Sequence, residues 1–389
     1  MAVKDQVLAL MKHTAAVYSG EKLAQALNVS RTAVWKAVRE LEKEGWRFEH
    51  TASGYRYLPS DVLDAAEILA MPSPFPDSGA AIKADQSFAQ ADAPAPDFQV
   101  AADDLKIPAA SASAAVSEAG TTAGSAADPL LFGDLPVDLA VEITETSEST
   151  MLEAKKAVAD GRSAPRLFIT ETQTGGHGRF GRPFFSPKGQ GIYMTLLLNP
   201  NHRFDDLPQY TLLAAVAVCD AIAALTGKEC EIKWVNDIYL EGRKVVGILS
   251  EATSDIESGT ISHISIGMGI NFSTPQTDFP QELQAKATSL FADGNRPPIT
   301  RNQLIRAIWQ RFFTLLAGLP EDTAYLEDYR RRSFVLGQTV RFRRQGAVIS
   351  GTAVAITDEG QLVVRTPEDT VTLNSGEISL ESIGERKLR

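Results

Sequence analysis

The sequence predicts an α+β protein of several domains. Its 389 residues are enough for two or three domains. Strand-like and helix-like segments alternate through the middle of the chain, and only short strand-like segments follow Gly337. We therefore expect four regions, with residues 1–60 forming a small helical domain, 61–135 a linker, 136–335 a central α+β domain and 336–389 a small barrel of the SH3-like type.

The first region has the pattern of a winged helix-turn-helix. An apolar face predicts a helix over residues 4–13, and Ser19 and Ser30 are typical caps for two further helices, the second of which spans 31–44. Residues 45–57 alternate like a hairpin, which would be the wing. A DNA-reading module and a small protein-interaction module both fit, and we favour DNA. The DNA-contacting residues would be Ser30, Arg31, Thr32, Trp35 and Lys36 on the third helix, with Arg47 and Arg56 on the wing.

Between about Pro72 and Asp134 the chain is rich in Ala, Ser, Asp, Pro and Gly. Such a composition cannot bury enough apolar surface to offset the entropy of ordering the chain, so we expect a largely disordered linker. Much of the net charge of -11 lies here, whereas residues 1–58 carry more basic than acidic residues. The overall charge therefore does not exclude DNA binding by the first region.

The central region should contain strands and helices in alternation. Strands are predicted over 137–143, 166–170, 192–198, 231–234, 244–250 and 263–268, and helices over 150–160, 207–225, 302–316 and 323–331. The C-terminal region should contain short strands at 340–342, 348–356, 362–364, 371–373 and 378–380.

A loop rich in glycine and arginine follows the predicted strand 166–170. Its sequence, from Glu171 to Pro187, is ETQTGGHGRFGRPFFSP. Glycine lets the backbone approach a ligand, and the two arginines carry forked donors that suit phosphate or carboxylate. The loop also satisfies G-x-G-x-x-G, but Pro183 and Pro187 argue against the helix that a dinucleotide site requires. An anion-binding loop is the interpretation we favour over a purely structural turn.

Three more segments place polar groups or glycines in strand-forming surroundings. They are Lys233–Leu240 with Lys244, then Gly267–Asn271, and Ser147–Met151 before a predicted helix. Polar groups in such positions need partners or a function. A salt-bridged hairpin would explain the first segment, and helix capping alone would explain Ser149.

Together these motifs resemble the biotin protein ligases, in particular the bacterial form that is also the repressor of the biotin operon. The family's Gly-Arg-Gly-Arg-x-Gly-Arg loop corresponds to Gly176–Arg182, its Lys-Trp-Pro-Asn-Asp to Lys233–Asp237, and its Gly-x-Gly-Ile-Asn to Gly267–Asn271. The Ser-Thr-Asn segment corresponds to Ser149–Met151. His177, Phe184, Val235 and Met151 depart from the residues that the family usually has, and Val235 in place of proline should loosen the turn before Asn236.

This resemblance implies a class II synthetase-like α+β biotin/lipoate ligase domain and a two-step reaction. Biotin and ATP, with Mg²⁺, form biotinyl-5′-adenylate, and a lysine of a biotin carboxyl carrier protein then displaces AMP. The catalytic residues would be Lys244, Arg179 and Asp237. The biotin-binding residues would be Ser149, Thr150, Met151, Gln173, His177, Gly178, Arg179, Lys244 and Gly247. The ATP-binding residues would be Arg179, Arg182, Phe184, Asn236, Asp237, Lys244 and Asn271.

Two other functions remain open at this stage. One is a lipoate-type acyl ligase, and the other is a transcription regulator that senses biotin without catalysis. The partners expected are the carrier protein, operator DNA and a second copy of the chain in a ligand-promoted homodimer. We expect a cytoplasmic protein without a membrane span. We expect no metal ligands with recognisable spacing, because Cys219 and Cys230 fit neither a metal site nor a disulfide framework.

Overall fold

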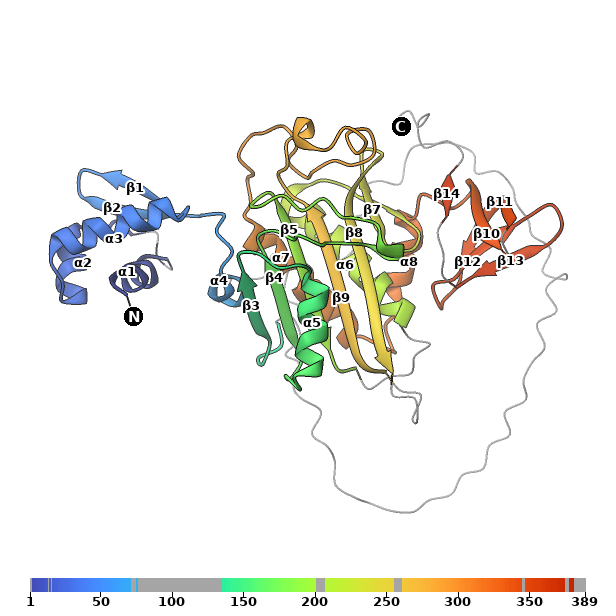
Figure 1. Cartoon of the computed structure of the whole chain (residues 1–389), viewed down its shortest axis with the longest axis horizontal. Helices are drawn as coiled ribbons and strands as arrows, with labels where there is room; N and C mark the ends of the chain where they lie inside the picture. Colours follow the sequence, from blue (N-terminus) through green and yellow to red (C-terminus); the bar gives the residue numbers. More distant parts are fainter. Residues whose placement is uncertain are drawn as a thin grey trace, which may run out of the picture. The chain divides into compact units, whose positions relative to one another are not determined.

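A computed structural model describes residues 2–12, 14, 16–70, 75, 135–200, 207–254, 261–344, 347–374 and 378–380. The first region contains α1 (Val3–Met11), α2 (Gly20–Leu27), α3 (Arg31–Lys43), β1 (Arg47–Thr51) and β2 (Gly54–Leu58), as Figure 1 shows. The Ser19 and Ser30 hydroxyls each accept a hydrogen bond at 3.1 Å, from the N–H of Lys22 and Ala33. Both predicted helix caps are thus confirmed.

These elements share their own hydrophobic core. Val34, Val38 and Leu41 on the inner face of α3 share this core with Phe48 of β1 and with Trp46 just before it. Asn28 turns the chain between α2 and α3 with a φ of 52°, a left-handed conformation that asparagine tolerates. The helix-turn-helix and its antiparallel hairpin agree with the sequence prediction.

The linker begins later than residue 61. Residues 65–70 form α4, and Leu63 and Ile68 belong to the hydrophobic core of the central region. Asn302 donates to the Glu67 carboxylate at 2.6 Å, and the buried Arg301 guanidinium lies 3.1 Å from Asp61. The prediction was wrong at this boundary because the apolar residues of this short helix are buried by residues far away in sequence. Nearly all of the segment 72–134 lies outside the described residues.

The central region is built on a seven-stranded mixed sheet in the order β3-β4-β5-β9-β8-β7-β6. Its strands are β3 (Ala140–Thr144), β4 (Arg166–Thr170), β5 (Gly191–Leu198), β6 (Glu231–Lys233), β7 (Asp237–Leu240), β8 (Arg243–Ser254) and β9 (Ile261–Asn271). Only β3 and β4 pair in parallel. The strand β7 was not among the predicted strands, since it is short and follows β6 after a three-residue turn.

Helices cover both faces of this sheet (Figure 1). Neighbouring residues of β5 point to opposite faces, and Thr195 contacts the start of α5 (Thr150–Ala159) while Met194 contacts Trp309 of α7 (Arg301–Ala317). The other helices are α6 (Leu207–Thr226) and α8 (Ala324–Arg332), with short 3-10 turns η2 (Arg179–Gly181) and η4 (Gln276–Asp278). By length and composition Gln209–Thr226 could cross a membrane, but most of it is buried inside this domain.

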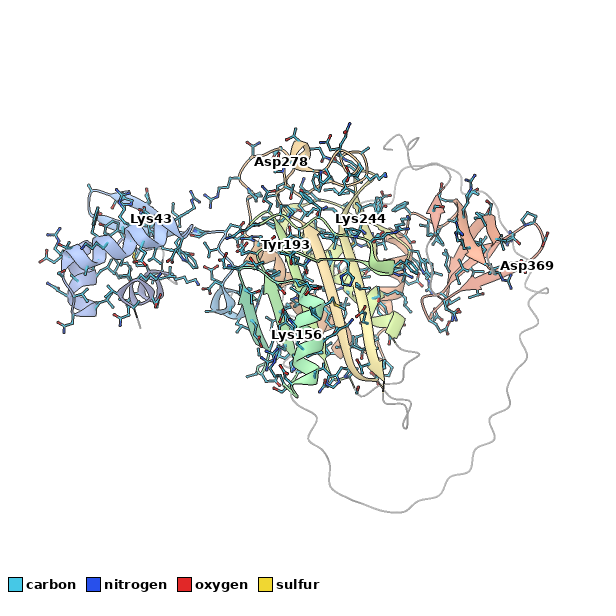
Figure 2. The ribbon with its side chains drawn as sticks, in the orientation of Figure 1. Lys43, Lys156, Tyr193, Lys244, Asp278 and Asp369 are labelled. Carbon is cyan, nitrogen blue, oxygen red and sulfur yellow. The ribbon has the colours of Figure 1, made fainter. Side chains whose placement is uncertain are left out.

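The C-terminal region is a five-stranded antiparallel sheet in the order β13-β12-β11-β10-β14. Its strands are β10 (Thr339–Arg344), β11 (Ala347–Ile356), β12 (Leu362–Arg365), β13 (Thr370–Leu373) and β14 (Ser379–Leu380), close to the predicted ranges. Figure 2 shows the side chains on all of these elements.

Candidate functional site

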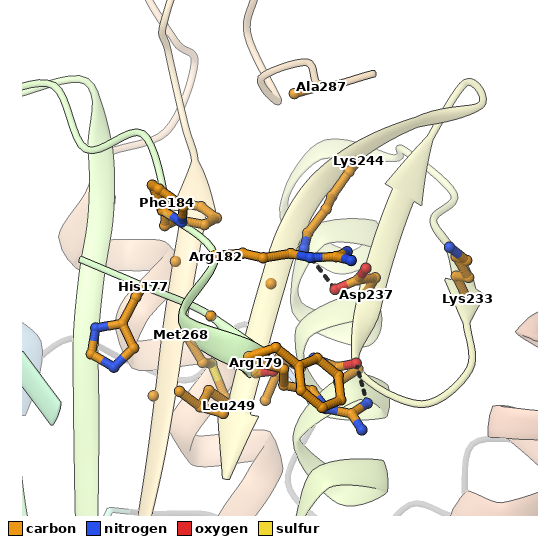
Figure 3. A pocket seen from close by; sticks show the side chains of 18 of the residues that line it. His177, Arg179, Arg182, Phe184, Lys233, Asp237, Lys244, Leu249, Met268 and Ala287 are labelled. Atoms are coloured by element: carbon orange, nitrogen blue, oxygen red, sulfur yellow. Dashed lines mark hydrogen bonds and ion pairs between the residues drawn. The ribbon is translucent and has the colours of Figure 1, made fainter. Parts of the chain in front are cut away.

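A cavity of about 360 Å³ opens beside the glycine-arginine loop, a size that suits a small molecule. The predicted catalytic and binding residues gather around it from segments far apart in the sequence (Figure 3). Those that line it are Ser149, Thr150, Met151, Gln173, His177, Gly178, Arg179, Arg182, Phe184, Asn236, Asp237, Lys244 and Gly247.

The glycine-arginine loop leaves β4 and folds back on itself. Gly178 N–H donates to the Arg182 carbonyl at 2.8 Å, and Phe184 N–H donates to the Gly176 carbonyl at 2.9 Å. Phe180 occupies the tip with a φ of 59° and is 71% exposed. Only the 3-10 turn η2 follows Gly178, and no α-helix begins between β4 and β5, so the structure agrees with our rejection of a dinucleotide fingerprint.

A buried polar group forms one end of the cavity. Ser149 and Thr150 begin α5 and are almost fully buried. Thr150 N–H donates to Gln173 Oε1 at 3.0 Å. Ser149 makes no side-chain cap bond, so helix capping does not explain it.

The glycines of the Gly267–Asn271 segment make room for other side chains of the cavity. A Cβ at Gly267 would come within 2.7 Å of Met151 Sδ, and a Cβ at Gly269 would come within 2.6 Å of the Phe184 ring. Real carbon atoms do not approach so closely, so any larger residue would displace Met151 or Phe184 from the cavity wall. The sequence argument foresaw a close approach here but did not identify what approaches.

Charged side chains line the other end. Lys244 Nζ lies 2.7 Å from Asp237 Oδ1, and Arg179 Nη1 donates to Asn236 Oδ1 at 3.3 Å (dashed in Figure 3). Asn236 Nδ2 in turn donates to the Ile248 carbonyl at 2.6 Å. These contacts hold cations and a carboxylate at one edge of a cavity, an arrangement able to neutralise an anionic ligand.

The turn before Asn236 is fixed by hydrogen bonds to residues outside the cavity. Its Trp234–Val235 peptide bond is cis. Trp234 Nε1 donates to the Gly360 carbonyl and Tyr329 Oη donates to the Val235 carbonyl, both at 2.9 Å. The salt-bridged hairpin considered from sequence is present between β7 and β8, but its charged residues face the cavity.

One predicted residue lies outside the cavity lining, and several lining residues were not predicted. Asn271 is buried and donates to the Thr288 carbonyl at 3.0 Å, so it supports the loop before α7. That loop contributes Lys286 and Ala287 to the wall, because its backbone pairs with Lys244. Ile378 reaches the wall from the C-terminal region. No periodicity in the sequence could indicate these pairings.

The predicted DNA-contacting residues lie on the first region. Arg31, Thr32 and Trp35 line a shallow surface hollow with the β1–β2 turn, and Trp35 is 50% exposed. Lys36 is exposed, Ser30 caps α3, Arg47 is partly buried, and Arg56 lies 3.1 Å from Glu49. DNA-reading residues usually lie at the start of the second helix of a helix-turn-helix, and the DNA contacts of these residues stay a prediction.

Comparison with known proteins finds a family match within each of the N-terminal, central and C-terminal regions. The profile of the "Biotin/lipoate A/B protein ligase family" matches residues 143–271, that of the "Biotin protein ligase C terminal domain" matches 335–381, and an HTH profile matches 4–56. The "Bifunctional ligase/repressor BirA" of Bacillus spizizenii is 30% identical over 369 residues, which cover 93% of each chain. The chain belongs to the biotin protein ligase family.

Further relatives support this membership. The "Biotin–[acetyl-CoA-carboxylase] ligase" of Mycobacterium tuberculosis is 31% identical over 225 residues, 54% of this chain and 77% of its own. The solved biotin protein ligase of Aquifex aeolicus "in complex with biotin and ATP" aligns with a TM-score of 0.54 and 25% identity, and covers 62% of this chain and 98% of its own. The biotin protein ligase fold thus accounts for the central region.

Proposed function

We propose that this protein is an ATP-dependent biotin protein ligase that also represses transcription in response to biotin. Its substrates are biotin and ATP, and its acceptor is a lysine of a biotin carboxyl carrier protein. One observation carries the proposal: a single cavity is lined both by hydrogen-bonding groups, at the buried Thr150 and the half-buried Gln173, and by cations, at Arg179 and Lys244. Biotin carries groups to match both, a polar ureido ring and a carboxylate.

In the first step the biotin carboxylate oxygen attacks the α-phosphorus of ATP. A carboxylate–phosphate bond forms, and pyrophosphate leaves. The barrier is the approach of two anions, and Lys244 lowers it by placing a fixed cation between them. Arg179 and Arg182 neutralise the phosphates, while Phe184 covers the adenylate side.

In the second step the carrier lysine attacks the acyl carbonyl of the adenylate. An amide bond forms, AMP leaves, and the attacking amine nitrogen loses a proton to solvent. The chemistry needs no covalent enzyme intermediate. Ordering of the loop around Arg179 keeps water away from the adenylate until the carrier arrives.

Magnesium fits this site as part of the nucleotide. Among the described residues no group of three or more His, Cys, Asp or Glu could hold a metal by itself. Asp237 is the one carboxylate in the cavity lining, and Mg²⁺ commonly takes one or two carboxylates together with phosphates. Bound there, the ion would offset phosphate charge.

The remaining parts follow from the same proposal. Residues 1–60 bind operator DNA through Ser30, Arg31, Thr32, Trp35 and Lys36, with Arg47 and Arg56 on phosphates. The central domain is class II synthetase-like, the C-terminal sheet is an SH3-like barrel, and the protein acts in the cytoplasm. A ligand-promoted homodimer would match the two-fold symmetry of an operator.

Transfer of radiolabelled biotin to a purified carrier domain tests the ligase activity directly. We expect incorporation that requires ATP and Mg²⁺ and that unlabelled biotin, but not lipoate, suppresses. Suppression by lipoate would favour a lipoate-type ligase. Biotin binding without incorporation would favour a non-catalytic regulator.

A further inference from the structure

A buried hydroxyl outside the cavity lining is connected to its polar end. Thr195 lies in the middle of β5, between β4 and β9, and is 0% exposed. A buried hydroxyl is unfavourable unless it is hydrogen-bonded, and valine would suit this strand position without that cost. Thr195 Oγ1 donates to Thr150 Oγ1 at 2.8 Å, a short bond between two buried groups.

This bond decides which way the Thr150 hydroxyl can act. Because Thr150 Oγ1 accepts from Thr195, its own proton is directed elsewhere. The acceptor that the structure places within reach is Gln173 Oε1, at 3.5 Å, which is the outer limit of a hydrogen bond. The proton is therefore held weakly and is available to a ligand in the cavity.

The orientation of the Gln173 amide is determined in a similar way. Its Oε1 accepts from Thr150 N–H at 3.0 Å, and its Nε2 donates to Ser186 Oγ at 3.3 Å. Ser186 Oγ donates its proton to the Phe184 carbonyl at 3.0 Å and so must accept from the amide. A flipped amide would bring two donors together at Thr150.

We propose that Thr195 is a positioning residue for biotin recognition, acting through Thr150. It makes the polar end of the cavity a set of donors, Thr150 O–H and Gln173 Nε2–H, which select a ligand group that only accepts. The ureido oxygen of biotin is such a group. This inference rests on the proposed function, which places the ureido ring at this end of the cavity.

A double-mutant cycle on biotin affinity tests the connection in the full-length protein. We expect Thr195→Val and Thr150→Val each to raise the biotin Kd about 10-fold in calorimetric titrations, as expected for one lost hydrogen bond with partial desolvation. The double variant should bind no more than about 2-fold more weakly than Thr150→Val alone. The ATP KM at saturating biotin should stay within about 2-fold of wild type.

A second pair guards against misfolding of the valine variant. Thr195→Ser keeps the hydroxyl and Thr195→Ala removes it, so within this pair only Ala should weaken biotin binding. The affinity for a biotin analogue with nitrogen in place of the ureido oxygen is a second measurement. It depends on hydrogen-bond direction, so a change in packing alone would not alter the preference between the two ligands. The preference for biotin over this analogue should fall in Thr195→Val, since Thr150 Oγ1 can then accept.

The possible failures are distinguishable. Three results would overturn the role of Thr195 even if Thr150→Val still weakens biotin binding. They are additive losses of affinity in the double-mutant cycle, equal biotin affinities in Thr195→Ser and Thr195→Ala, and an unchanged preference for biotin over the analogue in Thr195→Val. An unchanged affinity in Thr150→Val would refute the proposed position of biotin itself, and this inference with it.

Discussion

Lys244→Ala should nearly abolish adenylate formation while leaving the fold intact. Lys244 Nζ pairs with Asp237 Oδ1 at 2.7 Å, and the two side chains are 32% and 24% exposed. Removing the lysine turns a neutral pair at the cavity edge into a lone carboxylate. The reacting carboxylate and phosphate would then lose the nearby cation and face the uncompensated charge of Asp237.

The size of the effect follows from Coulomb's law. Two unit charges about 4 Å apart interact by about 4 kcal/mol at an effective dielectric constant of ~20, which corresponds to about 10³ in rate. Asp237 already offsets part of the Lys244 charge, so we expect a loss of about 10²–10³, as for other single electrostatic groups. A partly exposed ion pair contributes about 1 kcal/mol or less to stability, so the Tm should change by only about 3 °C.

Biotin-dependent pyrophosphate release is the direct assay. Transfer from biotinyl-5′-AMP supplied to the enzyme should suffer less, because that step no longer requires two anions to meet. Lys155→Ala is the matched control, since Lys155 also pairs with a carboxylate, Glu251 at 2.8 Å, but lies outside the cavity lining. Pyrophosphate release at near the wild-type rate in Lys244→Ala would refute the assignment.

Three further predictions test other parts of the chain. Arg179→Gly should release free biotinyl-adenylate, because the loop loses the hydrogen bond from Arg179 to Asn236. Biotin would then appear on lysines of added albumin. Labelling confined to the carrier protein would count against a role of Arg179 in retaining the adenylate. Deleting residues 1–60 should leave the Tm of the ligase domain nearly unchanged. Deleting residues 1–77 should lower this Tm by several degrees, because α4 and its buried contacts are then lost. Equal Tm values for the two deletions would contradict the assignment of α4 to the central core. In anisotropy titrations, Arg31→Ala should reduce sequence discrimination by about 1–3 kcal/mol, and Arg56→Ala should weaken all sequences alike and lower the salt slope by about one; the reverse pattern would exchange their roles.

The sequence by itself determined the local structure and much of the cavity's inventory. Ser19 and Ser30 begin helices because their hydroxyls accept from N–H groups three residues ahead, a contact that depends only on near neighbours. The run 166–170 is β4 as predicted, and the prolines of the glycine-arginine loop correctly excluded the α-helix that a dinucleotide site requires. The resemblance of its motifs to those of the biotin protein ligases was enough to name thirteen residues that line the cavity.

Tertiary structure alone decided what lies behind and around those residues. Leu63 and Ile68 belong to the central core, Asn271 supports the loop before α7, and Ile378 reaches the cavity from the C-terminal region. Thr195, which holds the Thr150 hydroxyl, is one of many β-branched residues in buried strands. Such contacts join residues tens to hundreds of positions apart, and their energies depend on packing and hydrogen-bond direction, which are settled only when the sheet and its helices come together.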